Sequence, residues 1–314
     1  MNRHRTKHRH EPLPLFVGAA LLTTVLCPAP VSAQSRDTSV RLSAGAVVDI
    51  TMRTGRLIVH GIDGSTGSVR ASGANYELRS TGVTLTLQSR DHASRSAMRD
   101  RDADREDTIE LNVPRGVRLV VSTLSADAEV RDISGSVEMR STSGDLQLTN
   151  ISGRSIIETI SGDVRTTATR TLLRAKTVSG DVRVREAEGD LELSTTSGDM
   201  SVSGVQIGRF VASSISGNVQ FDGLFTDDAR VQVNTHSGDV SLRLPDGAHG
   251  QATLSTFNGD FVPGGPITLL PGNDAARRGR NAQRFAFGTG SSPGLLLDIT
   301  TFNGDVRLLR GTRP

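Results

Sequence analysis

The chain has 314 residues, of which 35% are hydrophobic and only 3% aromatic, with no Trp and a single Tyr. This composition excludes a core built on large rings and argues against aromatic platforms that stack on sugars. The single Cys excludes a disulfide framework and a cysteine-based metal site, and the formal net charge is only +2.

Residues 1–33 have the pattern of an export signal. The positive n-region holds four bases: Arg3, Arg5, Lys7 and Arg9. An apolar stretch follows over residues 13–26, and Val31-Ser32-Ala33 offers the cleavage site, which leaves Gln34 as the first mature residue. The apolar stretch is too short for a membrane span, although a signal anchor that stays uncut is the alternative.

Removal of this leader changes the charge of the chain. The leader holds four of the 36 Lys and Arg residues and one of the 34 Asp and Glu residues, so the remainder carries a net charge of −1. Because phosphate binding needs a basic surplus, we expect no nucleic-acid partner. The only cysteine, Cys27, is removed as well, which suits an oxidising compartment.

A three-residue turn signature organises the rest of the chain. Six copies read Ser-Gly-Asp or Ser-Gly-Asn and two read Asn-Gly-Asp, with glycines at 144, 162, 180, 198, 217, 238, 259 and 304. Successive glycines are 18, 18, 18, 19, 21, 21 and 45 residues apart, and weaker half-step glycines, Gly153 and Gly189, lie midway in some repeats. A repeat of this regularity is typical of a solenoid.

Side chains between the turns alternate with a period of two, which indicates β-strands. Val182 and Val184 face one way on one strand, and Leu191 and Leu193 do so on the next. Equivalent apolar pairs recur in other repeats: Leu146 and Leu148, Met200 and Val202, Val219 and Phe221, Val231 and Val233, Val240 and Leu242. Two strands per repeat predict an all-β fold, a flattened β-solenoid of two facing parallel sheets, with about 18 residues per coil and coils about 4.8 Å apart.

Columns of related residues, one from each repeat, support parallel stacking. A hydroxyl column stands two residues before each turn: Thr159, Thr177, Thr195, Ser214, Thr235, Thr256 and Thr301. We expect these hydroxyls to hydrogen-bond from coil to coil. Outward columns alternate in charge: Arg140, Glu158 and Lys176 in one, Arg174 and Glu192 in another. Arg165 and Arg183, by contrast, would be like-charged neighbours, and an antiparallel meander with the same period remains the rival geometry.

One continuous domain is expected over residues 34–314, with irregular, strand-rich ends. Strands are expected at residues 56–59 and 83–87, followed by a charged, mobile loop at 89–107. A Gly/Pro/Arg-rich insertion at 263–293 separates the last two turns.

Two further features belong to the C-terminal half. The longer repeats are expected to extrude loops at residues 223–228 and 244–250, on the side away from the turns. Inside the insertion, residues 285–287 are expected to form a short strand.

Four segments carry a family resemblance: Thr54–Val59, Val113–Gly116, the repeated Thr-x-Ser-Gly-Asp-Val strands, and Phe287–Gly290 leading into Thr301–Asp305. In these the sequence resembles the "putative adhesin" β-strand-repeat family, a domain of unknown function in exported bacterial proteins. The resemblance implies an exported β-solenoid with an adhesin-like role, and it supplies no catalytic residues. The charged loop and the 45-residue step depart from the pattern of the family.

The turn aspartates are the first candidates for a metal site: Asp145, Asp163, Asp181, Asp199, Asp239, Asp260 and Asp305. Stacked carboxylates repel one another, and calcium relieves such repulsion in other Gly-Asp-rich repeats. Calcium needs roughly six to eight oxygen ligands, however, whereas each turn supplies one carboxylate, replaced by Asn218 in one repeat. We therefore predict no metal and no cofactor, and expect each Asp to cap amides of its own turn.

No catalytic residues are predicted. The histidines outside the leader are His60, His92, His236 and His249, and the nearest approach to an acid cluster is Asp222, Asp227 and Asp228 with His236. Because His236 takes the position that holds Ile, Val or Thr in other repeats, we expect it to vary freely. Phosphate-loop and His-Glu-x-x-His motifs are absent from the sequence.

Two groups of arginines are candidates for binding anionic envelope polymers or lipid headgroups. They are a loop with Arg277, Arg278, Arg280 and Arg284, and a stripe of Arg165, Arg183 and Arg185. A solvated surface is the alternative for both.

Together these observations favour an exported, non-enzymatic β-repeat protein, periplasmic or secreted to the cell surface. It would act as an adhesin-like or scaffolding module at the cell envelope, with an unidentified envelope polymer or envelope protein as partner. The outward columns would make repeated, individually weak contacts. The alternatives are a carbohydrate-active β-helix enzyme and an accessory protein of an envelope-stress signalling system.

Overall fold

The computed structural model describes residues 37–43, 45–72, 76–89, 108–270, 281–289 and 294–311. The chain divides into two units, Met1–Pro30 and Val31–Pro314, and every described residue belongs to the second. The regular elements among the described residues are β-strands, 21 in all, joined in one hydrogen-bonded sheet. The expected leader and residues 90–107 of the expected charged loop lie outside the described residues.

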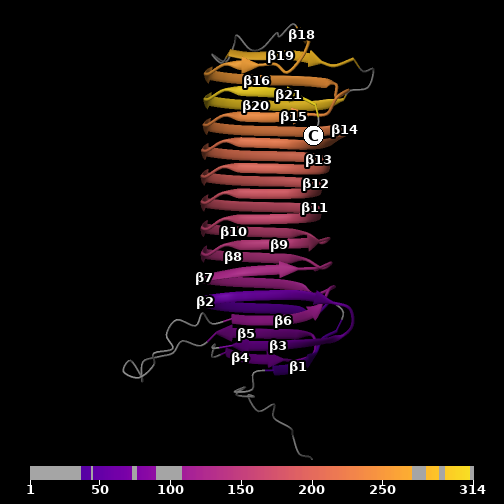
Figure 1. Cartoon of the computed structure of the whole chain (residues 1–314), viewed down its shortest axis with the longest axis vertical. Coiled ribbons are helices and arrows are strands. Elements are labelled where there is room, and N and C mark those ends of the chain that lie inside the picture. Colours follow the sequence, from indigo (N-terminus) through magenta and orange to yellow (C-terminus); the bar gives the residue numbers. More distant parts are fainter. Residues whose placement is uncertain are drawn as a thin grey trace, which may run out of the picture. The chain divides into compact units, whose positions relative to one another are not determined.

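The middle of the chain is a stack of parallel coils. Its strands are β7 (Arg118–Arg131), β8 (Val137–Ser143), β9 (Leu146–Ile151), β10 (Ser155–Ser161), β11 (Val164–Ser179), β12 (Val182–Ser197), β13 (Met200–Ser216), β14 (Val219–Ser237) and β15 (Val240–Leu244). Val164, Val182 and Met200 pair in register on successive strands, and Figure 1 shows these strands lying one above another. The predicted β-solenoid is confirmed, and the antiparallel alternative is wrong for this part of the chain.

A thin aliphatic core fills the coils. Val182, Val184, Leu191 and Leu193 are each at most 1% exposed, and the apolar pairs predicted in the other repeats are buried as well. Burying one such side chain stabilises the fold by about 1.5–3 kcal/mol. Each inward residue packs between equivalents on the adjacent coils, so a single coil could not bury its core face without its neighbours.

Glycine is required in the turns for two independent reasons. The backbone of Gly180 has a φ of +147°, which side-chain-bearing residues rarely adopt. A Cβ at this position would also lie only 2.1 Å from the carbonyl oxygen of Gly162 on the preceding coil. On the other side, the Gly180 N–H donates to the Ser197 carbonyl at 3.1 Å. The backbones of successive turns are therefore in close contact.

The bend opposite the turns differs from the expected half-step turn. β11 to β14 run through this bend as continuous strands of 16 to 19 residues, so each coil there has one tight turn instead of two. Four non-glycine residues with positive φ mark the bend at 18-residue spacing: Asp132, Asn150, Ala168 and Glu186. The extra residues expected at 223–228 are present, but they form an irregular part of β14, where the register with β13 shifts, and not a separate loop. A turn does join β15 to β16 within residues 244–250.

The N-terminal end of the stack combines parallel and antiparallel strands. They are β1 (Asp37–Arg41), β2 (Val47–Ile62), β3 (Thr66–Ser72), β4 (Tyr76–Ser80), β5 (Thr84–Ser89) and β6 (Thr108–Pro114). β2 pairs in parallel with β5, β6 and β7, which continues the coils. The pairs β1–β3, β3–β6 and β4–β5 are antiparallel. The strands expected at 56–59 and 83–87 correspond to β2 and β5.

At the C-terminal end, the order of the coils in the stack differs from their order in the sequence. The strands here are β16 (Gly250–Asn258), β17 (Phe261–Val262), β18 (Ile267–Leu269), β19 (Asn281–Phe287), β20 (Leu295–Asn303) and β21 (Val306–Arg310). β20 pairs in parallel with β14 on one side and with β16 on the other, and β21 lies likewise between β15 and β17. Figure 1 shows these two yellow strands among the orange ones. The antiparallel hairpin of β18 and β19 covers β16, and it contains the strand expected at 285–287.

The hydroxyl column is buried and in register, but the expected hydrogen bonds along it are wrong. Thr159 pairs with Thr177, and Thr195 with Ser214, yet the hydroxyl oxygens of all seven members lack a partner among the described residues. Equivalent atoms on stacked strands are about 4.8 Å apart, whereas an O–H···O bond needs about 2.7–2.8 Å. Further toward the N-terminus, Thr123 does donate to Oγ of Ser141 at 2.9 Å.

Gly180→Ala is expected to lower the free energy of unfolding by about 2–4 kcal/mol, because it adds both positive-φ strain and an overlap with the Gly162 carbonyl. Urea denaturation followed by circular dichroism measures the loss. Gly116→Ala is the control, since no atom lies within 4 Å of the added Cβ. Equal losses in the two variants would contradict the close contact at the turns.

Thr195→Val is expected to leave the free energy of unfolding unchanged or to raise it by up to about 1 kcal/mol, because the buried hydroxyl has no partner to lose. Thr123→Val breaks the bond to Ser141 and should cost about 1 kcal/mol. Thermal and urea denaturation of both variants compare the two cases. A loss at Thr195 as large as that at Thr123 would show that the hydroxyl column is hydrogen-bonded after all.

Candidate functional site

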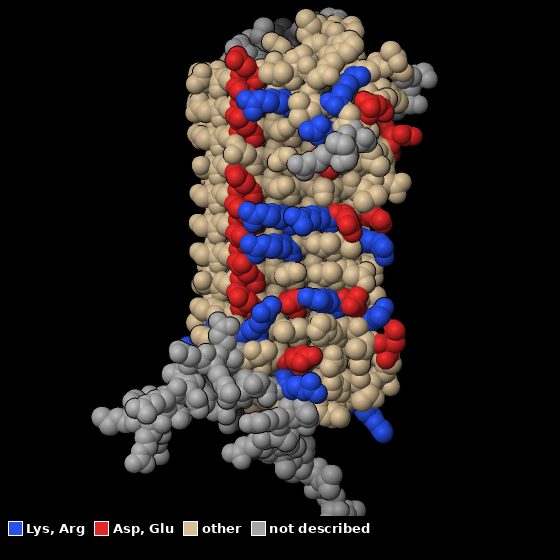
Figure 2. Space-filling model, viewed as in Figure 1, with Lys and Arg blue, Asp and Glu red and all other residues tan. Residues whose placement is uncertain are grey.

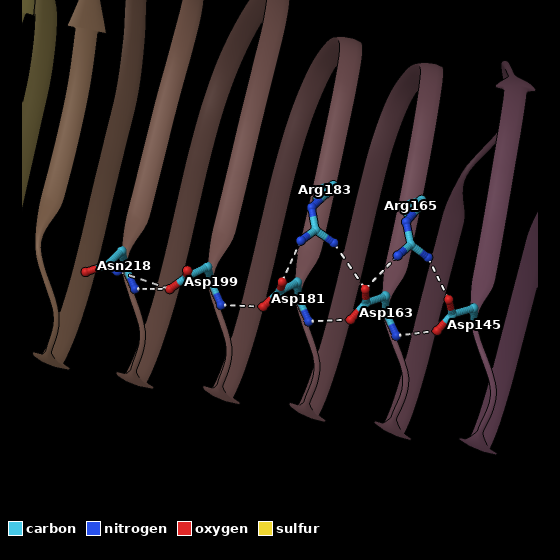
Figure 3. Close-up of polar contacts among 7 residues, drawn as sticks. All are labelled: Asp145, Asp163, Arg165, Asp181, Arg183, Asp199 and Asn218. Carbon is cyan, nitrogen blue, oxygen red and sulfur yellow. Dashed lines mark hydrogen bonds and ion pairs between the residues drawn. The ribbon is translucent and has the colours of Figure 1, made fainter.

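The turns of successive coils line one edge of the solenoid, where their aspartates form a continuous series of hydrogen bonds. The backbone N–H of Asp163 donates to Oδ1 of Asp145 at 3.0 Å, and that of Asp181 donates to Oδ1 of Asp163 at 3.0 Å (Figure 3). The same bond joins every further pair of neighbours at 2.8–3.0 Å. In stacking order this aspartate ladder contains Asp127, Asp145, Asp163, Asp181, Asp199, Asn218, Asp239, Asp305 and Asp260.

The ladder corrects the expectation that each Asp caps its own turn. Each carboxylate instead accepts a hydrogen bond from the equivalent residue of the next coil. The asparagine at position 218 fits the series because its side-chain oxygen accepts the N–H of Asp239 at 2.9 Å. The aspartates therefore hold coils together rather than only shaping their own turns.

Arginines placed two residues after a turn aspartate join neighbouring rungs of the ladder. The two terminal nitrogens of Arg165 contact Oδ2 of Asp145 and of Asp163, both at 2.7 Å (Figure 3). Arg183 bridges Asp163 and Asp181 in the same way, at 3.1 and 2.6 Å. Arg165 and Arg183 are neighbours in register, as expected, but each lies between two carboxylates, so their mutual repulsion is compensated.

A third arginine of this kind occurs at the C-terminal end. Arg307 bridges Asp239 at 3.1 Å and Asp305 at 2.8 Å. Sequence reasoning missed these bridges, although the Asp-Val-Arg pattern that all three share was a usable signal. For Arg307 the partner Asp239 is 68 residues away and becomes a neighbour only through the placement of the last coil.

The ladder lowers the pKa of at least one of its carboxyl groups. Burial raises the pKa of Asp145, but the N–H of Asp163 and the guanidinium of Arg165 together outweigh it, so the pKa lies below its ordinary value of 3.8. The same hydrogen bond raises the pKa of Arg165. Carboxylate repulsion is thus met by amide and guanidinium groups. Within the described ranges, no group of three or more His, Cys, Asp or Glu is arranged to hold a metal ion.

Beside the ladder runs an exposed apolar ridge. The residue that follows each buried hydroxyl points outward at this edge, and we call the series the turn-edge ridge: Leu124, Ile160, Val178, Ile215, His236, Phe302 and Phe257. The six apolar members are 42–68% exposed. In Figure 2, the red line of ladder carboxylates follows the edge of the molecule. Thr142 and Thr196 take the ridge position in two coils, so the fold does not require an apolar residue there.

Three rings stack at the C-terminal end of the ridge. The ring centroids of His236 and Phe302 are 5.0 Å apart with an interplanar angle of 10°, and those of Phe302 and Phe257 are 4.8 Å apart at 2°. Phe257 is the most exposed of them, at 68%. The low aromatic content had argued against any aromatic platform. The sequence alone did not reveal this stack, because β20 brings Phe302 between residues of β14 and β16.

The outward charge columns follow the prediction in part, because Lys176 is level with Glu158 but forms no ion pair among the described residues. Arg140 contacts Glu158 on the next coil at 3.2 Å, and Arg174 contacts Glu192 at 2.6 Å. The hydrogen bond to Glu158 raises the pKa of Arg140. These pairs are exposed and screened by water, so each contributes little to the stability of the fold.

The residues considered for catalysis have separate partners. Asp222 pairs with Arg243 at 3.4 Å, Asp228 accepts a hydrogen bond from Thr226 at 3.3 Å, and His236 stacks on Phe302. The other candidates are dispersed: His60 is half-buried on β2, Asp227 is exposed on β14, His249 lies before β16 with a buried Nε2, and His92 is outside the described residues.

The two arginine groups predicted from the sequence differ in how far the structure describes them and in which partners they have. In the stripe, Arg165 and Arg183 are occupied by ladder carboxylates, whereas Arg185 is exposed and has no ion pair among the described residues. In the loop, Arg277, Arg278 and Arg280 lie outside the described residues, and Arg284 belongs to β19.

A family model described as Toastrack DUF4097 matches residues 62–309, which is most of the chain. The chain belongs to the Toastrack DUF4097 family. This membership confirms the resemblance that the repeated turn motifs suggested. The segment Thr54–Val59, which contributed to the resemblance, precedes the matched residues.

The Toastrack chain is also similar to solved structures, at low identity. A "putative adhesin" from Bacteroides fragilis is 9% identical, with a TM-score of 0.35 over 88% of this chain and 99% of that one. A "putative lipid binding protein" from Parabacteroides distasonis is 13% identical, with a TM-score of 0.36 over 87% and 97%. A "putative cell adhesion protein" from Clostridium sporogenes is 8% identical, with a TM-score of 0.23 over 87% and 98%. Likeness this distant carries no argument about function.

Two further findings complete the comparison. A search of curated proteins found no match. In the part of the Toastrack chain that the structure describes, no helix is long and apolar enough to cross a membrane.

Asp145→Asn is expected to reduce the acid sensitivity of the protein. The Asp145 carboxyl has a pKa below its ordinary 3.8 in the folded state, so its stabilisation is complete above that value and is lost as the pH falls through the folded pKa. Asparagine keeps the acceptor for the Asp163 N–H, as Asn218 does naturally, but loses the charge that pairs with Arg165. Urea midpoints measured from about pH 7 to pH 2 should therefore fall less steeply in the variant.

Two companion variants complete this experiment. Asp145→Ala removes the acceptor as well and should cost a further 1–2 kcal/mol or so at pH 7. Asp246→Asn alters an exposed aspartate that has no ion pair among the described residues, and should leave the profile unchanged. A profile of Asp145→Asn identical to that of the wild type would mean that the ladder charge does not stabilise the fold.

Proposed function

We propose that this Toastrack protein is an exported, non-enzymatic binding module of the cell envelope, adhesin-like in that many weak contacts hold its partner. Family membership supports a β-repeat domain of this kind, and the leader-like residues 1–33 support export. The turn-edge ridge carries the proposal.

The ridge has the properties of an interaction surface. Its apolar side chains point away from the core, with Ile160 at 53%, Ile215 at 56% and Phe257 at 68% exposure. Grouped exposed apolar side chains mark sites of interaction in soluble proteins. On the ridge, Ile160 and Val178 lie on paired strands, and the rings of Phe302 and Phe257 stack. Because equivalent positions repeat about every 4.8 Å along a rigid stack, a partner can engage several of them at once.

The chemistry of this edge favours a protein partner over a polymer. Ile, Val, Leu and Phe side chains gain free energy by covering apolar surface on another protein. The adjacent carboxylates of the ladder would repel an acidic polymer. We therefore assign an envelope protein with an apolar surface as the partner at the ridge.

The described acids and histidines support a non-enzymatic role. Asp222, Asp228 and His236 each have a different structural partner, and none of them is paired with another as an acid and a base. General acid–base catalysis needs such groups within reach of one substrate.

The test is binding of the purified full chain to washed envelope fragments of the source organism. Ile160→Thr combined with Ile215→Thr replaces two ridge residues by the one that Thr142 and Thr196 supply naturally, so the fold should persist. We expect binding to weaken about tenfold, because two exposed aliphatic contacts are lost. Co-sedimentation at graded protein concentrations measures the change.

The matched control is Val83→Thr combined with Leu269→Thr, which changes two exposed apolar residues away from the ridge, at 61% and 68% exposure. The control should bind like the wild type. Equal binding by the ridge variant would refute the role of the ridge. Release of reducing ends from envelope glycans by the wild type would favour the carbohydrate-active enzyme instead.

A further inference from the structure

A groove of about 540 Å³ crosses the C-terminal coils on the face formed by the strand halves that precede the turns. Its floor and walls come from β13, β14, β20, β16 and β19, which lie side by side. The polar lining residues include Arg209, Arg230, Arg284, Gln232, Gln251 and Asp298. Five adjacent strands give the groove a length of about 19 Å along the stack.

The three arginines of this groove form no ion pair with a described residue, unlike Arg140 and Arg174 on the same face. Arg209 and Arg230 are neighbours in register on β13 and β14, and both are exposed. Neither they nor Arg284 form an ion pair with any described residue. Asp190 stands in register with Arg209 on β12 but is not within ion-pair distance of it. On the same face, Arg174 and Arg140 are both paired with glutamates.

Two adjacent guanidinium groups without a carboxylate favour an anion between them. Their mutual repulsion is relieved when one negative group takes hydrogen bonds from both, and a planar carboxylate suits the fork of each guanidinium. Arg284, on β19 at the far end of the groove, offers a second positive group to a ligand that runs along the stack axis.

The remaining lining matches a glycan better than a membrane. Gln232, Gln251 and Thr253 can exchange hydrogen bonds with hydroxyl groups, and Asp298 can accept them. Leu296, 42% exposed, offers an apolar contact for the C–H groups of a sugar ring. A lipid surface would meet a concave site that contains an aspartate and little exposed apolar surface.

We propose that this groove binds an acidic glycan, with a carboxylate held by Arg209 and Arg230 and the chain extending toward Arg284. The inference rests on the proposed function and deepens it by naming a ligand class at a surface separate from the ridge. The groove exists because the last coil departs from the repeat: β20 supplies Asp298 and Leu296, and the inserted hairpin supplies Arg284.

The experiment measures binding of the purified full chain to polygalacturonate, a carboxylate polymer, and to dextran, a neutral one. We expect binding to polygalacturonate that weakens with salt, and no binding to dextran. Arg209→Gln combined with Arg230→Gln should weaken polygalacturonate binding about tenfold or more, because charge-assisted hydrogen bonds are lost. Arg284→Gln alone should weaken it by a smaller factor.

The matched control is Arg41→Gln combined with Arg154→Gln, which removes the same charge at two exposed arginines without ion pairs among the described residues. The control should bind like the wild type, and circular dichroism should show all variants folded. The proposal is overturned if the wild type does not bind polygalacturonate, or if the groove and control variants weaken equally. Binding to phosphatidylglycerol vesicles without binding to polygalacturonate would also overturn it and assign the groove to lipid.

The ridge variant Ile160→Thr/Ile215→Thr separates this proposal from the proposed function. It should keep full affinity for polygalacturonate while losing affinity for envelope fragments. Loss of glycan binding in the groove variant alone, with ridge-dependent envelope binding intact, supports both. A wild type that binds the glycan but whose envelope binding is insensitive to the ridge substitutions would refute the ridge and leave the groove supported.

Discussion

Close backbone contact between successive turns is the constraint on which this structure depends. At each turn a glycine lies against the backbone carbonyl of the equivalent residue below it, and the Gly180–Gly162 approach leaves no room for a Cβ. This contact sets the register, so that Val182 lies over Val164 and the aliphatic core becomes continuous. With the register fixed, every residue type that recurs at the same repeat position becomes a column on the surface or in the core.

The aspartate ladder shows how such a column becomes cohesive rather than repulsive. Asp145 accepts the N–H of Asp163, and Arg165 then bridges their second oxygens, so each added coil supplies donors for the carboxylate before it. The hydroxyl column shows the opposite case. Its members are in register, yet Thr159 and Thr177 have no hydrogen-bond partner among the described residues, whereas Thr123 and Ser141 at the same repeat position form a bond. Stacking by itself therefore brings equivalent side chains close together. The length and orientation of each side chain decide whether a hydrogen bond forms.

The two proposed binding surfaces have different origins in the stack, one in its regular repeats and the other in its irregular C-terminal end. The ridge comes from the regular repeat, since Ile160, Val178 and Ile215 occupy one position in different coils. The acidic-glycan groove comes from the irregular end, where β20 enters between β14 and β16 and the β18–β19 hairpin covers β16. The entry of β20 between β14 and β16 also completes the ring stack, because it places Phe302 between His236 and Phe257.

The repeat spacing and the period-two alternation determined the parallel β-solenoid, its core residues and charge pairs such as Arg174 with Glu192. These follow from the sequence because in-register stacking is a matter of counting. Only the tertiary structure decided that Asp145 serves the next coil, that Arg307 meets Asp239, and that Arg209 and Arg230 have no acidic partner. Counting residues along the repeats shows which residues are level with one another on neighbouring coils. It does not give side-chain reach, and it fails where a coil's neighbour in space is not its neighbour in sequence.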